Sequence, residues 1–155
     1  MSKQQLMKQF REVEKACERI SASAPSVSHW TVGQQIDHIC LVTAKIITSM
    51  ENHPSDKPGN KFSLLRLIVM GTGRIPRGKA KAPEHVVPQE SPDKAHIDAV
   101  VAAARNCLER LDGIPETAWF KHVYFGFLNK KQGMRFLYIH TGHHLRIIKD
   151  ILRAA

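Results

Sequence analysis

Three histidines stand close together near the C-terminus, in the segment IHTGHHL, which contains His140, His143 and His144. His140 and His144 are four residues apart, so in a helix both project from one face, about 6 Å apart along the axis. Two imidazoles at that spacing can bind the same metal ion. His143 points roughly 100° away from His144, toward a different surface, which makes it the weaker ligand candidate.

The hydrophobic pattern places this pair on a buried face. Leu137, His140, His144, Ile148 and Ile151 follow helical spacing, so the two histidines lie inside an apolar stripe. A buried neutral imidazole needs a partner for each ring nitrogen, and a metal ion would satisfy one nitrogen of each. The alternative is a pair of ordinary core histidines, since a chain with nine histidines contains such spacings by coincidence.

A third ligand candidate, His38, lies much earlier, in GQQIDHICLV. Leu41 and Val42 follow it at one turn's distance, so His38 also borders an apolar face. Asp37 points elsewhere on the helix and is interpreted as a solvated carboxylate. His38, His140 and His144 are therefore the residues from which a metal site could be built.

These residues must be positioned by helices, and five segments show helical signals. Apolar stripes recur over residues 6–20 and 97–111, and the segments 31–50 and 130–155 carry the histidines. The nearly all-apolar segment 61–70 is short, and we expect it to be central in the fold.

Capping residues mark where the helices begin. Thr31 and Gln34 form a capping-box pattern, and the last helix follows Asn129. The helix around Ile97 is expected to start at Ser91 as N-cap, with Pro92 in its first position.

Two segments do not fit a helix. Residues 72–91 contain three prolines and two glycines and are expected to form a long irregular loop, while WFKHVYFGFL is a short aromatic connector, either extended or a tight turn. The three cysteines, Cys17, Cys40 and Cys107, are interpreted as reduced thiols in apolar faces because they show no metal-site spacing.

Length and composition indicate one globular domain, residues 1–155. No apolar run is long enough to span a membrane and the N-terminus lacks the apolar core of a signal peptide, so we expect a cytoplasmic protein without a membrane partner. The net charge of +9 favours an anionic partner without choosing between nucleic acid and an acidic small molecule.

The segment WTVGQQIDHI, followed much later by HTGHHL, resembles the DinB-like (DinB/YfiT) superfamily of metalloenzymes. PRGKAKAP and HVYFGFLNKKQGMRFLYIHTGHHLR resemble one uncharacterised branch of it, so the similarity touches most of the chain from Trp30 onward. The resemblance implies an all-α, up-down four-helix bundle, with the long loop and the aromatic connector as additions. It also implies a divalent metal bound by His38, His140 and His144.

Activity is implied by the same resemblance. Characterised relatives include thiol-dependent S-transferases and a metal-dependent hydrolase, many members have no known activity, and members often form homodimers. Many relatives read HxxHHxxQ, whereas this chain has Ile147 at the glutamine position, so a polar neighbour of the site is missing. Three imidazoles suit zinc or nickel best, with iron or manganese as alternatives.

The surroundings of the site are less well defined by the sequence. No general base is evident, and His122 and His143 are the candidates for a catalytic role. The basic residues Arg74, Arg77, Lys79 and Lys81 could hold an anionic substrate, or they could belong to a solvated loop.

Three functions remain open. The first is a metal-dependent transferase, of the thiol S-transferase type, or a hydrolase acting on a small molecule that is anionic or thiol-bearing. The second is a metal-binding or stress-associated protein without turnover. The third, a basic nucleic-acid-binding module, is disfavoured because residues 71–91 contain no aromatic side chain for base stacking.

Overall fold

The computed structural model describes residues 1–53, 55, 58–59, 63–78 and 81–155. This part of the chain is mostly helical, which confirms the expected fold class. The α-helices are α1 Lys3–Ala16, α2 Val32–Glu51, α3 Leu64–Thr72, α4 Lys94–Arg110 and α5 Lys130–Ala154, and the strands are β1 Trp119–His122 and β2 Gly126–Asn129. No helix in the described ranges is long and apolar enough to cross a membrane.

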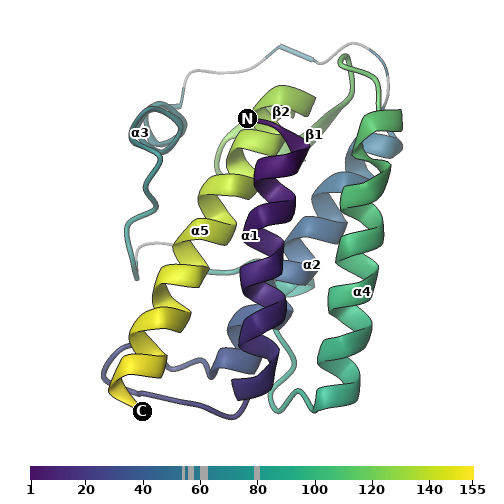
Figure 1. Cartoon of the computed structure of the whole chain (residues 1–155). Helices are drawn as coiled ribbons and strands as arrows, with labels where there is room; N and C mark the ends of the chain where they lie inside the picture. Colours follow the sequence, from purple (N-terminus) through teal and green to yellow (C-terminus); the bar gives the residue numbers. More distant parts are fainter. Residues whose placement is uncertain (54, 56–57, 60–62, 79–80) are drawn as a thin grey trace.

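Four long helices, α1, α2, α4 and α5, pack alongside one another (Figure 1). An ion pair of 2.7 Å joins Arg110 to Glu51 at the C-terminal ends of α4 and α2, so these two helices run in the same direction. α1 and α5 run the opposite way (Figure 1). The connection between α2 and α4, residues 52–93, therefore travels back along the bundle and is called the crossover segment below.

The helices begin where capping chemistry permits. Capping boxes are present at Ser2, Thr31 and Asn129. The sequence predicted the box at Thr31 and the start of the last helix after Asn129. The expected start of α4 at Ser91 is wrong, because Asp93 is the N-cap and its carboxylate accepts a hydrogen bond of 2.7 Å from the backbone N–H of His96. Aspartate and serine are similarly good N-caps, so the sequence offered two possible starts, and the helix begins after the second.

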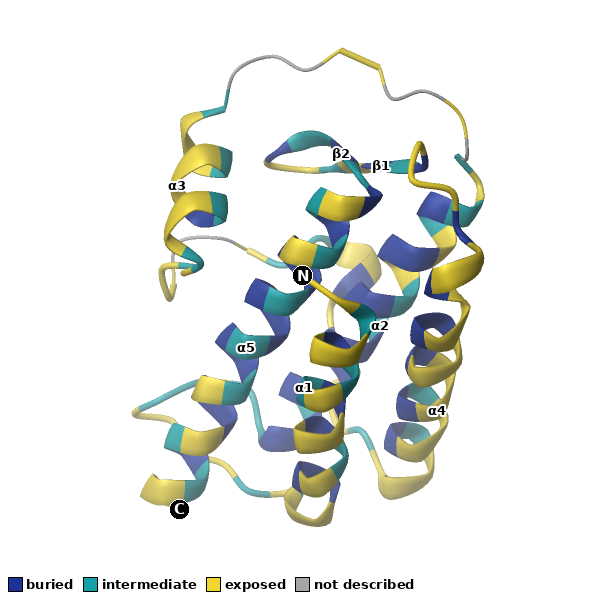
Figure 2. Cartoon of the chain, turned by 45° about the horizontal axis from the view of Figure 1, so that its top comes forward, coloured by how far each residue is buried: buried dark blue, intermediate teal, exposed yellow. Residues whose placement is uncertain are grey.

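The core lies between the four long helices. Both predicted apolar stripes are buried, that of α1 through Leu6, Phe10 and Val13 and that of α4 through Ile97 and neighbours at helical spacing. Figure 2 shows these helices with their buried sides turned toward one another and their exposed sides outward. Cys17, Cys40 and Cys107 are buried and free, as expected.

α3 is not central, and that expectation is wrong. Only Val69 of this helix is buried, while Leu64 and Leu67 are 59% and 60% exposed. Figure 2 shows α3 apart from the long helices with much of its surface exposed. Its apolar composition was interpreted as a sign of burial. The helix belongs to the crossover segment and lies outside the four long helices. Lys61 and Phe62, included in the predicted helix, lie outside the described residues.

The aromatic connector is an antiparallel β-hairpin, in which Trp119 pairs with Asn129 and His122 with Gly126. It packs tightly on the start of α5, since a Cβ at Gly133 would lie 3.0 Å from the Phe120 ring. The hairpin thus lies at one end of the bundle, next to the start of α5 (Figure 1).

Candidate metal centre

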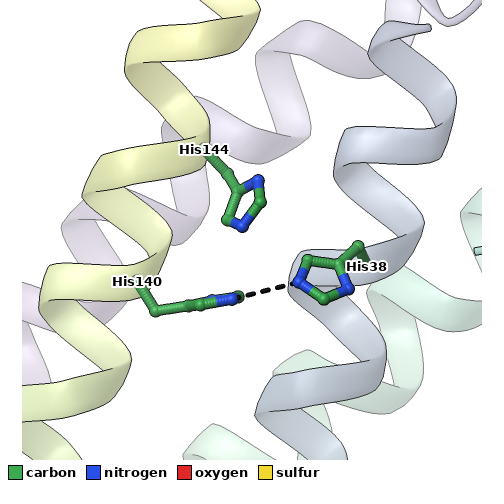
Figure 3. A group of neighbouring side chains, drawn as sticks. All are labelled: His38, His140 and His144. Atoms are coloured by element: carbon green, nitrogen blue, oxygen red, sulfur yellow. Dashed lines mark hydrogen bonds between the residues drawn. The ribbon is translucent and has the colours of Figure 1, made fainter. Parts of the chain in front are cut away.

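The three candidate ligands converge inside the bundle. His38 comes from α2, and His140 and His144 come from successive turns of α5, which runs antiparallel to α2. All three are at least nine-tenths buried. Their rings point toward one another in Figure 3, and one ligand atom from each lies within 4.8 Å of the others. The described chain therefore contains a three-histidine group that could hold a metal ion.

Neighbouring groups fix the orientation of two of these rings. His38 Nδ1 lies 2.7 Å from the Val86 carbonyl oxygen, and His144 Nδ1 lies 2.6 Å from Gln35 Oε1. Both partners are acceptors, so each Nδ1 carries the hydrogen and each Nε2 keeps its lone pair. This outer hydrogen bond is the arrangement that supports metal-binding histidines.

His140 lacks such a partner in the described structure, because its Nδ1 is buried without a hydrogen bond. Its Nε2 lies 3.1 Å from Nε2 of His38 (Figure 3). Two lone pairs at that distance repel unless a hydrogen or a cation lies between them. In a tetrahedral zinc site two histidine nitrogens are about 3.3 Å apart, given metal–nitrogen bonds of about 2.0–2.1 Å. The observed separation therefore fits a shared cation.

Burial keeps the imidazoles neutral. It lowers the pKa of His38, and it lowers the pKa values of His140 and His144 well below the usual value, with mutual repulsion adding to the effect. Neutral imidazole is the form that binds metals, so the protein presents these ligands without a cost of deprotonation at neutral pH.

The expectation that Asp37 is a solvated carboxylate is wrong. This residue is 1% exposed. One of its oxygens accepts a hydrogen bond of 2.8 Å from the backbone N–H of Gln89 and lies 3.1 Å from Nε2 of His96. The turn of about 100° that directs Asp37 away from His38 points it at α4 and the end of the crossover segment, rather than at water.

Gln35 is a site residue that the sequence analysis missed. Ile147, where many of the resembled proteins have glutamine, is buried and apolar, yet His144 still has an amide partner, supplied by α2 instead of α5. Gln35 precedes His38 by three residues, so it lies on the same face of α2 one turn earlier. That spacing was a usable signal.

A cavity of about 310 Å³ opens beside the three histidines. Its lining includes both residues singled out for a catalytic role, His122 and His143. His143 was expected to face a different surface, but it is only 8% exposed, and its ring lies 5.0 Å from that of His144, centre to centre. His143 is therefore near the three-histidine group without being part of it.

The two additional histidines differ in their hydrogen bonding. The backbone N–H of Tyr124 donates to Nδ1 of His122 at 3.1 Å, so the hydrogen of His122 is on Nε2. His143 instead hydrogen bonds to the backbone of Ile75, as a donor to its carbonyl, which leaves a lone pair on the other ring nitrogen. Burial lowers the pKa of each to about 4, so both are neutral at pH 7.

The predicted basic residues separate into two groups. Lys81 lines the cavity, whereas Arg77 forms an ion pair of 2.7 Å with Asp150. Arg74 is exposed and is not among the lining residues, and Lys79 lies outside the described residues. Two lysines that the sequence analysis did not consider, Lys45 and Lys121, also line the cavity.

Comparison with known proteins identifies a family but no individual relative. Neither the curated proteins nor the solved structures contain a significant match to the chain. One family profile, described as a protein of unknown function (DUF1569), matches residues 2–150. Because this match covers nearly all of the sequence, the chain belongs to the DUF1569 family.

Proposed function

We propose that the protein binds a divalent metal ion through His38, His140 and His144. The observation that carries the proposal is the convergence of three buried imidazoles, with Nε2 of His140 lying 3.1 Å from Nε2 of His38. A shared cation would bind a lone pair of each ring, and the separation of these two nitrogens fits a tetrahedral zinc site. Zinc or nickel suits three imidazoles best, and iron or manganese is an alternative.

The proposed activity is a transferase reaction of the thiol S-transferase type, or a hydrolysis, on a small molecule. Three neutral ligands leave the full charge of the ion and an open position, and such an ion makes hydroxide or thiolate available near neutral pH. The adjoining cavity supports the idea of a substrate. The resemblance to the DinB-like superfamily supports the same two reaction types.

In this proposal His143 and His122 have different roles. The free lone pair of His143 would accept a proton from the attacking group. His122, with its hydrogen on Nε2, would donate a hydrogen bond to a substrate oxygen as negative charge develops there. These roles follow from the hydrogen bonds that each ring makes to the backbone.

The test is the metal content of purified protein, measured by inductively coupled plasma mass spectrometry after loading with zinc or nickel and removal of free metal. We expect one ion per chain in the wild type and loss of that ion in His38→Ala and His144→Ala. His29→Ala is the matched control because His29 is exposed. Equal metal content in all four proteins would contradict the assigned ligands.

Metal binding without turnover is the second candidate. The described lining of the cavity contains no Asp or Glu that could act as a general base. Screening of metal-loaded protein with thiols and activated esters separates the candidates, since only the first predicts turnover that is lost in His143→Ala while the metal is retained.

A further inference from the structure

The cavity beside the histidines has a chemical character of its own. Its walls are largely apolar, with side chains from α2, α3, the hairpin and α5. Three lysines, Lys45, Lys81 and Lys121, also line it, and the described lining residues include no carboxylate to balance them. An apolar cavity with uncompensated positive charge is complementary to a molecule that is apolar along its body and negative at one end.

The lysine on α2 lies at a defined distance from the candidate metal centre. His38, Val42, Lys45 and Ser49 all line the cavity and follow one another at helical spacing along one face of α2. Lys45 is seven residues beyond His38, which corresponds to about 10 Å along the helix axis. Positive charge and candidate metal centre are thus separated by about the length of a small organic molecule.

The other two lysines reach the cavity from different segments. Lys81 belongs to the crossover segment, whose backbone is tied to the hairpin because the Tyr124 hydroxyl donates to the Lys81 carbonyl at 2.9 Å. Lys121 is on β1. Lys45 and Lys81 are exposed, so they lie at the open side of the cavity, and neither forms an ion pair within the described part of the chain.

The position of α3 also fits an amphipathic ligand. Leu65 and Val69 of α3 line the cavity, and Leu65 remains 42% exposed although it faces other apolar side chains there, such as Ile46 and Phe125. An apolar ligand in the cavity would cover part of the exposed surface of Leu65.

We propose that this cavity binds an amphipathic organic anion, with its negative group at Lys45 and Lys81 and its opposite end at the three histidines. A medium-chain carboxylate with a thiol or another reactive group at the far end has this chemistry. The orientation of the ligand rests on the proposed function, because it places the reactive end at the metal. Binding of the apolar body and the anion does not, because it needs only the cavity and the lysines.

The first experiment uses metal-free protein, so that carboxylate cannot bind to metal. Octanoate and 1-octanol are titrated into ¹⁵N-labelled protein, and amide chemical shifts report both the affinity and the location. We expect octanoate to bind beside α2, α3 and the hairpin, about three- to tenfold more tightly than octanol, since partly exposed charge pairs contribute about 0.2–1 kcal/mol each.

Variants decide whether the lysines cause this preference. Lys45→Met combined with Lys81→Met keeps the apolar stems and removes both charges, so the preference for octanoate should disappear while octanol binding persists. Lys149→Met is the matched control, since Lys149 is exposed on α5 and does not line the cavity. Equal affinity for the two ligands in the wild type, or a preference unchanged in the double variant, would overturn the proposal.

The second experiment tests orientation in cobalt-loaded protein. 8-Mercaptooctanoate should give thiolate-to-cobalt absorption at lower concentration than 8-mercaptooctanol or 3-mercaptopropionate, and Lys45→Met with Lys81→Met should remove the advantage over the alcohol. If octanoate binding depends on the lysines but cobalt does not bind, the proposed function fails and the anion site stands. If cobalt binds and all three thiols act equally, the anion site fails and the metal site stands.

Discussion

Two adjacent residues of α2, Asp37 and His38, belong to two buried polar groups that differ in their chemistry. One oxygen of Asp37 accepts a hydrogen bond from the backbone N–H of Gln89 and lies near the ring of His96, while its other oxygen has no partner in the described structure. His38 faces two other imidazoles, one of which has a nitrogen without a partner there. The Asp37 group contains a carboxylate held by a backbone donor, whereas the His38 group contains three neutral rings whose nitrogens lie close together.

The two residues contact neighbouring parts of the crossover segment. Asp37 accepts a hydrogen bond from the backbone N–H of Gln89, and the ring of His38 lies 2.7 Å from the Val86 carbonyl oxygen three residues earlier. The carboxylate and the imidazole therefore both join the end of the crossover segment to α2.

The largest expected effect is on metal affinity in His38→Ala. Loss of one of three ligands should weaken metal binding by at least about a hundredfold, since even outer-shell substitutions cost about 10–100-fold. Isothermal titration calorimetry with zinc measures this. Metal at 100 times its Kd should also raise the free energy of unfolding of the wild type by about 2.7 kcal/mol, but not that of His38→Ala.

Asp37→Ala should show the opposite behaviour. It removes the charged acceptor of the Gln89 backbone N–H, so the free energy of unfolding of the metal-free protein should fall by about 1.5–3 kcal/mol. Urea denaturation measures the change. One metal ion per chain should still bind, because the three imidazoles remain. If Asp37→Ala lost the metal while keeping its stability, the distinction between the two groups would be wrong.

A smaller effect on zinc affinity is expected at Gln35, which lies on α2 and contacts one of the three histidines. Gln35→Leu removes the acceptor of His144 Nδ1 and should reduce zinc affinity by about 10–100-fold without abolishing stoichiometric binding. Titration against a competing chelator resolves such a change. Gln34→Leu, one residue away and on the capping box of α2, is the control for general damage to the helix start and should leave the zinc affinity unchanged.

The sequence predicted the shared buried face of His140 and His144 and the starts of α2 and α5, because these features are local. Four-residue spacing and apolar neighbours suffice to place His140 and His144 together on a buried face. The burial of Asp37, the peripheral position of α3 and the arrival of Lys45 and Lys121 at one cavity depend on what packs opposite each helix. Periodicity indicates that a face is covered, but it does not identify the covering segment.

The smallest effect concerns pH and extends the same comparison, because a partly buried imidazole outside the three-histidine group also affects stability. Burial lowers the pKa of His122 to about 4 from 6.5. Below pH 6.5 His122 is protonated in the unfolded chain but stays neutral in the folded protein. This residue therefore lowers the free energy of unfolding increasingly as the pH falls toward 4. At pH 5.5 the cost is about 1 kcal/mol.

His122→Phe removes this titration while keeping an aromatic ring against Phe125 and Phe136. The other buried histidines titrate in both proteins, so the difference between wild type and variant isolates His122. In urea denaturation of the metal-free proteins, the variant should gain about 1 kcal/mol relative to the wild type between pH 7.5 and 5.5. A difference that does not change with pH would mean that folded His122 accepts a proton as readily as the unfolded chain, and the donor role assigned to its neutral ring would then fail.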